Sequence, residues 1–214
     1  YEPSGTPQPA QQDFHAALDA NGRWVSTPQY GTVWVPYASQ QAGWRPYTYG
    51  HWVYTEYGWT WASDEPWGWA AYHYGRWAIV VPYGWVWVTG YVWAPAWVVW
   101  RSGGGYIGWA PIPPDYAYGT TYYSESHIQY DYWSYCQSGH MGSPHIRTVV
   151  VYGEKARPYY QRTVVVNNSR RAGGPNGGYY NAGPSRSDAA RWTGRPVQQQ
   201  PVSRVPRMAP PGRT

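Results

Sequence analysis

The sequence lacks most of the residues from which globular proteins build their interiors. Its 214 residues include one Leu (Leu18), one Phe (Phe14) and five Ile, whereas cores are usually built from Leu, Ile and Val. The apolar material is instead Val together with 17 Trp and 24 Tyr. These residues favour a pleated, half-buried surface, so we expect an all-β protein with an aromatic interior.

Cysteine, lysine and long apolar runs are also scarce. Cys136 is the only cysteine, which excludes an intrachain disulfide. Lys155 is the only lysine, and the other fifteen basic residues are Arg, which stacks on aromatic rings and binds carboxylates in a fork. No run approaches the roughly 18 consecutive apolar residues of a membrane-spanning helix, so we expect no transmembrane span.

The charge is divided along the chain. Residues 1–149 hold five Arg and nine acidic residues (net −4), and residues 150–214 hold eleven basic and two acidic residues (net +9). The basic part has three open uses: it binds an anionic polymer or headgroup, it straps back over the aromatic sheet, or it is a solvated tail. The candidates for stacking or for an anionic partner are Arg45, Arg76, Arg101, Arg170 and Arg171.

The aromatic residues follow a repeat. GWRPYTYGHW (43–52) and GWAAYHYGRW (68–77) align without a gap, and each leads into a segment with a shared template. The template is Gly, a basic residue or His, Trp, an extended run, a turn ending in Tyr-Gly, and a second extended run that contains Trp. Gly supplies the left-handed conformation that such a turn requires. We therefore predict β-hairpins at 22–36, 50–63 and 75–88.

These hairpins define the predicted fold class: all-β, with consecutive short antiparallel Trp-rich hairpins forming a compact sheet or sandwich. Val strands at 148–152 and 163–167, one short C-terminal helix and an extended Pro/Arg-rich tail follow. The start, DFHAALDAN (13–21), is a candidate short helix with Asp13 as its cap, and a short extended pairing is the alternative. The expected divisions are a flexible leader (1–12), the Trp-rich hairpin region (13–112), a Tyr-rich segment with the Val strands of the same domain (113–167) and a Gly/Pro/Arg-rich extension (168–214) with a helix at 185–193.

The YG[HR]W hairpins, WRPY (44–47), WAPAWVVWR (93–101) and GWAPIPP (108–114) resemble a Trp/Tyr-rich family of exported bacterial proteins, domain of unknown function 6600. NAGPSRSDAARWTGRPV (181–197) is also similar to its C-terminal part, so the resemblance extends over roughly 13–205. It implies export to the periplasm or cell surface, with no established activity and no catalytic residues. The polar, Pro/Gln-rich start agrees with export, since it is typical of the end left after removal of a signal peptide.

The aromatic residues have two possible roles. Strand alternation places Trp59 with Trp61, and Trp85 with Trp87, on one face of their strands. Exposed, these four would form a platform on which sugar rings stack. We favour the alternative that they form the core, because the sequence offers little else to fill it.

One cluster has residues that bind metals, namely His127, Cys136, His140 and His145. Thiolate and imidazole suit zinc or copper, but the spacing matches no standard zinc pattern, so we expect neither a metal nor another cofactor. Catalytic signals are weaker still. Glu56 lies at a turn tip, Asp64 and Glu65 diverge in a loop, and no nucleophile-elbow motif is present. We therefore expect a protein that is not an enzyme.

These patterns favour an exported structural or interaction protein of the bacterial envelope or cell surface. We expect an aromatic-cored scaffold that packs against itself or a partner protein, because hairpin edges allow assembly by strand addition. One alternative is a module that binds peptidoglycan or exopolysaccharide; another is a metal-binding protein at Cys136, His140 and His145. Nucleic acid is not an expected partner of an exported protein.

Overall fold

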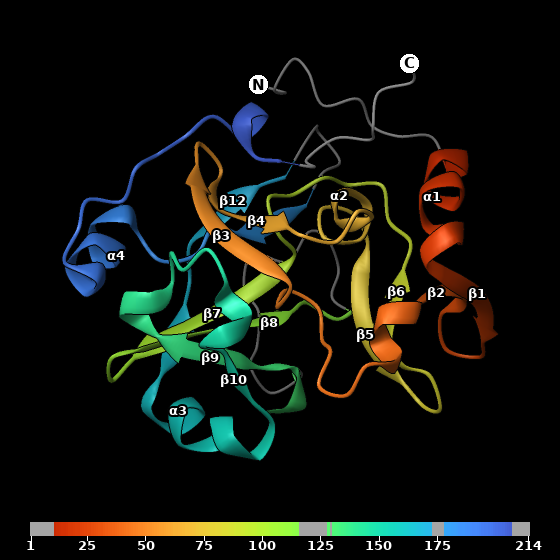
Figure 1. Cartoon of the computed structure of the whole chain (residues 1–214), viewed down its shortest axis with the longest axis horizontal. Coiled ribbons are helices and arrows are strands. Elements are labelled where there is room, and N and C mark those ends of the chain that lie inside the picture. The colour runs from red at the N-terminus through yellow and green to blue at the C-terminus, as the bar shows by residue number, and fades with distance from the viewer. Residues whose placement is uncertain (1–10, 116–127, 129, 173–177, 207–214) are drawn as a thin grey trace.

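The structure is a computed structural model that describes residues 11–115, 128, 130–172 and 178–206 (Figure 1). These residues form thirteen strands and four short α-helices, which confirms the mostly-β prediction. Figure 1 shows α1 and the strands β1, β2, β5 and β6 on one side of the molecule, and the strands β7 to β10 with α3 on the other. Most of the predicted leader lies outside the described residues, but residues 11 and 12 already belong to a helix.

Four consecutive hairpins form the body of the protein. The three that the template predicts are β1–β2 (Gly22–Thr27 and Gly31–Pro36), β3–β4 (Gly50–Thr55 and Gly58–Ser63) and β5–β6 (Arg76–Val80 and Gly84–Val88). The fourth is β7–β8 (Val98–Gly103 and Tyr106–Pro111). The glycine that ends each template turn has a positive φ, of 66°, 98° and 73° at Gly31, Gly58 and Gly84.

Each hairpin sets two tryptophans directly opposite one another. The pairs are Trp24 and Trp34, Trp52 and Trp61, Trp77 and Trp87, and Trp100 and Trp109. Opposed residues in antiparallel strands project from the same face, so each hairpin supplies one indole pair to one side of its sheet. Except for Trp24, which is half-buried, all of these indoles are buried in one aromatic core.

The glycine that opens each template segment makes room for the second tryptophan of the pair. A Cβ atom added at Gly75 would lie 2.7 Å from Trp87 Nε1, and one added at Gly50 would lie 2.9 Å from Trp61 Cζ2. One added at Gly22 would likewise overlap the Trp34 ring. Packing against the facing indole therefore explains the recurrence of Gly two residues before the first Trp.

The strands combine into four antiparallel sheets. One has the order β1-β2-β6-β5, and a second has the order β10-β9-β8-β7-β11, with β9 at Ser134–Gln137, β10 at Val151–Tyr152 and β11 at Val164–Val166. The pairs β3–β4 and β12–β13 (Ser169–Arg171 and Tyr179–Asn181) stand alone. The two predicted Val strands exist as β10 and β11, but they are shorter than predicted and lie at opposite edges of the five-stranded sheet.

The helices are short. The predicted helix at 185–193 is confirmed as α4 (Arg186–Thr193): Ser185 Oγ accepts a hydrogen bond from Asp188 N–H, and Gly194 ends the helix with a left-handed conformation. The first helix, α1 (Gln11–Leu18), begins earlier than predicted, so Asp13 lies within it and is not its cap. Two helices were not predicted, α2 (Gly68–Ala71) and α3 (Arg157–Arg162).

The two copies of the aromatic repeat meet in the core. Tyr47 and Tyr72, at equivalent positions of the repeat, have ring centroids 4.8 Å apart, and Tyr47 Oη donates to Tyr72 O. Each also packs against the tryptophan that ends its own copy, Tyr47 against Trp52 at 6.0 Å and Tyr72 against Trp77 at 5.9 Å. The repeat therefore builds two similar aromatic pairs that contact each other through their tyrosines.

Residues 195–206, here called the C-terminal strap, return to β3. Gln199 forms a parallel bridge with Tyr54, and Gln200 N–H donates to Tyr54 O at 3.0 Å. Val202 N–H donates to Glu56 Oε2 at 2.9 Å, and Val205 is buried against Ala62. Residues 195–206 therefore strap back over the aromatic sheet, which is one of the three uses considered for the basic C-terminal part, since they pack along the Trp-rich hairpin β3–β4.

Candidate functional site

The four tryptophans considered as a platform are part of the core. Trp59, Trp61, Trp85 and Trp87 have exposed fractions of 3, 0, 9 and 0%. A sugar ring stacks only on an indole whose face is open to solvent, so the alternative that these four residues form a sugar-binding platform is wrong. The physical reason is that both faces of these strands are covered, which alternation along a strand does not reveal.

Three of the five candidate arginines are buried against aromatic rings. The guanidinium carbon of Arg76 lies 3.6 Å from the Trp97 ring centroid, that of Arg101 lies 4.1 Å from Tyr160, and that of Arg45 lies 4.8 Å from Tyr152. These three side chains stack within the protein and are not available to an anionic partner.

The other two candidates lie near the surface on β12. Arg170 Nη1 donates to Glu56 O at 3.1 Å, and the guanidinium carbon of Arg171 lies 6.0 Å from the Tyr179 ring centroid. These contacts involve other residues than the rings on which the three buried arginines stack.

Of the candidate metal ligands, Cys136 and His140 line one small cavity. Cys136 is buried on β9, His140 and His145 are exposed, and His127 lies outside the described residues. Burial raises the pKa of the Cys136 thiol to about 12, which keeps it in the protonated form that binds metals poorly. Within the part of the chain that is described, no three His, Cys, Asp or Glu side chains converge as a metal site requires.

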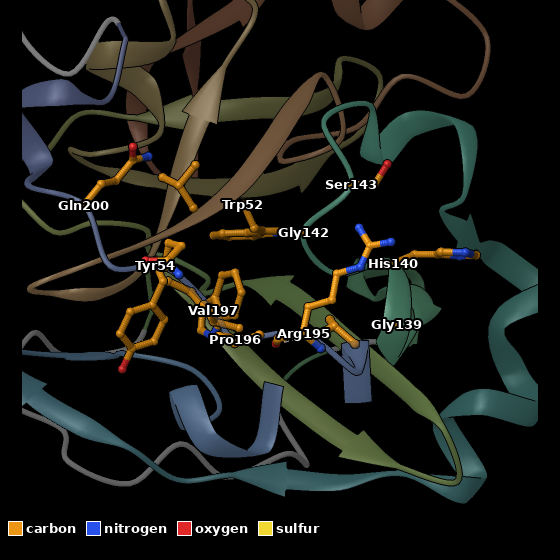
Figure 2. Close-up of a pocket in the computed structure, with 14 residues that line it drawn as sticks. Trp52, Tyr54, Gly139, His140, Gly142, Ser143, Arg195, Pro196, Val197 and Gln200 are labelled. Carbon is orange, nitrogen blue, oxygen red and sulfur yellow. Dashed lines mark hydrogen bonds between the residues drawn. The ribbon is translucent and has the colours of Figure 1, made fainter. Parts of the chain in front are cut away.

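A cleft opens beside β3 where the C-terminal strap separates from it (Figure 2). It has a volume of about 670 Å³, within the range of about 300–1,000 Å³ typical of small-molecule sites. We call it the β3 cleft. Its walls are β3 and β4 residues 52–54 and 59, the turn at 139–143, and residues 193–200 at the end of α4 and the start of the strap.

A buried hydrogen-bonded cluster surrounds Glu65, in the loop between β4 and α2. Trp44 Nε1 donates to Glu65 Oε1 at 2.9 Å, and Tyr72 Oη donates to Glu65 Oε2. Burial raises the pKa of the Glu65 carboxyl to about 7, although both of these hydrogen bonds act to lower it. Sequence reasoning missed this cluster because it treated Glu65 as a loop residue. The aromatic residues that follow it closely, Trp67, Trp69 and Tyr72, together with Trp44 of the repeat, were the available sign of a buried loop.

Glu65 gives the stability of the protein a defined dependence on pH. Its pKa is higher in the folded state than in the unfolded state, so folding favours the protonated form. The contribution of Glu65 to the free energy of unfolding is fully present below about pH 4.5 and is lost as the pH rises through about 7. Between these two pH values we expect the free energy of unfolding of the wild-type protein to fall by about 3 kcal/mol relative to that of Glu65→Gln. This amount follows from the difference between the folded and unfolded pKa of Glu65.

Urea denaturation of both proteins across pH 4–8 measures this difference. Subtracting one profile from the other also removes the contribution of His73, whose pKa burial lowers to about 4. Parallel profiles would contradict a raised pKa at Glu65.

Comparison with known proteins agrees with the resemblance over the Trp-rich region. Residues 15–116 match the model of a family of unknown function, DUF6600. The matched segment holds α1 from residue 15 onward and all four hairpins but not the C-terminal part, to which the resemblance was expected to extend. No curated protein matches the chain, and no solved structure does. No helix of the described residues has the length and apolar character needed to cross a membrane. Residues 15–116, which include the hairpin body that carries most of the aromatic core, are thus the part of this chain that is similar to the family of unknown function DUF6600.

Proposed function

We propose that this protein is an exported, non-catalytic structural or interaction protein of the bacterial envelope or cell surface. In this proposal its aromatic-cored scaffold presents a sheet edge to another copy or to a partner protein. The dense indole packing supports a rigid body, because neighbouring rings such as Trp52 and Trp100 lie with centroids 4.5 Å apart. A rigid body that presents a strand loses little conformational entropy on binding.

The observation that carries the proposal is the unequal covering of the sheet edges. Both edges of β3–β4 are bonded: Gln200 N–H donates to Tyr54 O on one side, and Trp59 and Trp61 N–H donate to Ala182 O and Pro95 O on the other. On β5, Ile79 N–H donates to Tyr132 Oη. By contrast β1, six residues long, pairs with β2 alone among the described strands. Such an edge favours the addition of a strand.

Cross-linking tests this edge. Ser26 is exposed on β1, and Ser187 is exposed on α4 as a matched control, so each is replaced by Cys in turn. Because Cys136 is buried, we expect little cross-linking of the protein without an added cysteine. We expect Ser26→Cys to form a bis-maleimide adduct with a second copy, or with an envelope protein in cells, about tenfold faster than Ser187→Cys. Association through β1 raises the local concentration to about the millimolar range.

Equal cross-linking rates for the two variants, together with a monomeric mass by light scattering, would contradict assembly through β1. Export is tested separately by fractionating cells that produce the full-length protein. We expect it in the periplasm or on the cell surface, and recovery in the cytoplasm alone would rule out that part of the proposal.

A further inference from the structure

Trp52, one of the residues that line the β3 cleft, has main-chain groups without a partner among the described residues. Trp61 N–H donates to Pro95 O, so it does not bond to Trp52, its opposite residue in the hairpin. The N–H and C=O of Trp52 must then point away from β4. Tyr54, two residues along, directs its main-chain groups to the same side, where its C=O accepts from Gln200 N–H.

Nothing in the described chain bonds to the N–H or C=O of Trp52 on that side. The buried indole Nε1 of the same residue also has no hydrogen-bond partner among the described residues. Trp52 lines the cleft, and Figure 2 shows its ring beside β3 with Pro196, Val197 and Arg195 of the strap facing it. Leaving a buried polar group without a partner is unfavourable, so a ligand that bonds to the N–H and C=O of Trp52 is stabilised by relieving that cost.

The polar side chains at the cleft favour a ligand with negative charge. Arg195 of the strap and His140 of the turn at 139–143 both line it, and none of the lining residues, all in described ranges, is acidic. Ser143, Gln198 and Gln200 add neutral hydrogen-bonding groups from the same two walls. The cleft therefore offers one permanent positive charge and several neutral donors and acceptors around an aromatic base.

The shape of the cleft limits how a ligand enters. The strap crosses to β3 at Tyr54, where the Gln199 bridge and the Gln200 hydrogen bond close that end. An extended peptide that paired with Trp52 could not continue along β3 past this point. A ligand that ends inside the cleft and carries many hydroxyl groups fits both the closed end and the scattered donors and acceptors.

We propose that the β3 cleft binds the end of a saccharide that carries a carboxylate. Its hydroxyl groups bond to the N–H and C=O of Trp52 and to Gln198 and Gln200, and its carboxylate bonds to Arg195. Of the four tryptophans that the sequence suggested as a platform, only Trp59 lines this cleft. The proposed site depends on hydrogen bonds, whereas the platform would depend on stacking.

Matched sugars test the ligand class. Glucuronate and glucose differ only in the carboxylate, and N-acetylmuramate differs from N-acetylglucosamine by its carboxylate-bearing ether group. Titration calorimetry and saturation-transfer NMR on the full chain measure binding of each. We expect an acidic sugar of either pair to bind about tenfold more tightly than its neutral counterpart, because only the acidic sugar can form a charge-assisted hydrogen bond with Arg195.

Three variants place the binding in the cleft. Gly142 lines it, has open space where a Cβ atom would lie and has no positive φ, so Gly142→Tyr fills the cleft without strain in the fold and should abolish binding. Arg195→Gln should weaken binding of the acidic sugar about tenfold and leave the neutral sugar unchanged. Arg204→Gln, an exposed strap arginine that does not line the cleft, is the charge-matched control and should bind as wild type. Thermal unfolding verifies that each variant is folded.

Absence of binding by all four sugars would overturn the proposal, as would equal affinity for acidic and neutral sugars or undiminished binding by folded Gly142→Tyr. An acidic peptide that binds wild type but not Gly142→Tyr, where the sugars do not bind, would assign the cleft to a protein partner instead. These outcomes are independent of the cross-linking at Ser26, so the proposal for the cleft and the proposal for the β1 edge fail separately.

Discussion

Gly75→Ala is expected to lower the free energy of unfolding by about 2–5 kcal/mol. The added methyl group would meet Trp87 Nε1 at 2.7 Å and would lie closer still to the main-chain oxygen of Val88. Overpacking of this kind costs about 1–3 kcal/mol, and the left-handed φ of 64° at Gly75 adds about 1–2 kcal/mol for a residue with a Cβ atom. Urea denaturation of the two proteins at one pH measures the loss.

Gly84→Ala separates these two costs. Gly84 has a similar φ of 73°, but nothing lies within 4 Å of a Cβ atom placed there. We expect Gly84→Ala to lower the free energy of unfolding by only about 1–2 kcal/mol, the cost of the left-handed backbone conformation. If Gly75→Ala and Gly84→Ala lost the same stability, close packing of the facing indole would not be the reason for the glycine that opens the template.

Arg101→Ala is expected to destabilise the protein by about 4 kcal/mol, and Arg101→Lys by about 3 kcal/mol. Arg101 is buried on β7, where Nε donates to Thr163 Oγ1 and Nη2 donates to Tyr160 O, both at 3.1 Å, and Nη2 also donates to Thr163 O. Hydrogen bonds from charged donors contribute about 1.5–3 kcal/mol each, and lysine cannot reproduce the planar fork that makes them.

The matched control for Arg101 is Arg23→Lys. Arg23 is exposed on β1, and its guanidinium carbon lies 5.7 Å from the Tyr83 ring centroid without a described hydrogen bond. We expect Arg23→Lys to change the free energy of unfolding by less than about 0.5 kcal/mol, as measured by thermal or urea unfolding. A stable Arg101→Lys protein would show that stacking on Tyr160, and not the hydrogen-bonding fork, holds α3 and β11 to β7.

The hairpins could be predicted because their determinants are local. A left-handed glycine at the end of each turn and a Trp on each strand lie within about fifteen residues, so the sequence contains both the turn and the pairing. The helices α2 and α3 escaped prediction because they are four and six residues long and carry no side-chain cap. α2 lies in one copy of the aromatic repeat, whereas the other copy forms turns, so tertiary packing decides between them.

The cleft could not be predicted because its walls come from segments far apart in the chain. Trp52, the turn at 139–143 and the strap meet only after the hairpins have packed, and no residue spacing signals that meeting. The role of the arginines was partly predictable. Abundant Trp and Tyr indicated stacking for Arg45, Arg76 and Arg101, but sequence alone did not show that burial removes them from any partner.

The return of the strap to β3 has a consequence for the order of events during biosynthesis. Tyr54 and Glu56 receive their partners from Gln200 and Val202, which leave the ribosome roughly 146 residues later. Chains emerge from the N-terminus at about 5–20 residues per second, so the β3 edge stays open for on the order of ten seconds. During that time the nascent hairpin offers an unpaired edge to a chaperone or to the wrong strand, and truncation before Gln199 would make this exposure permanent.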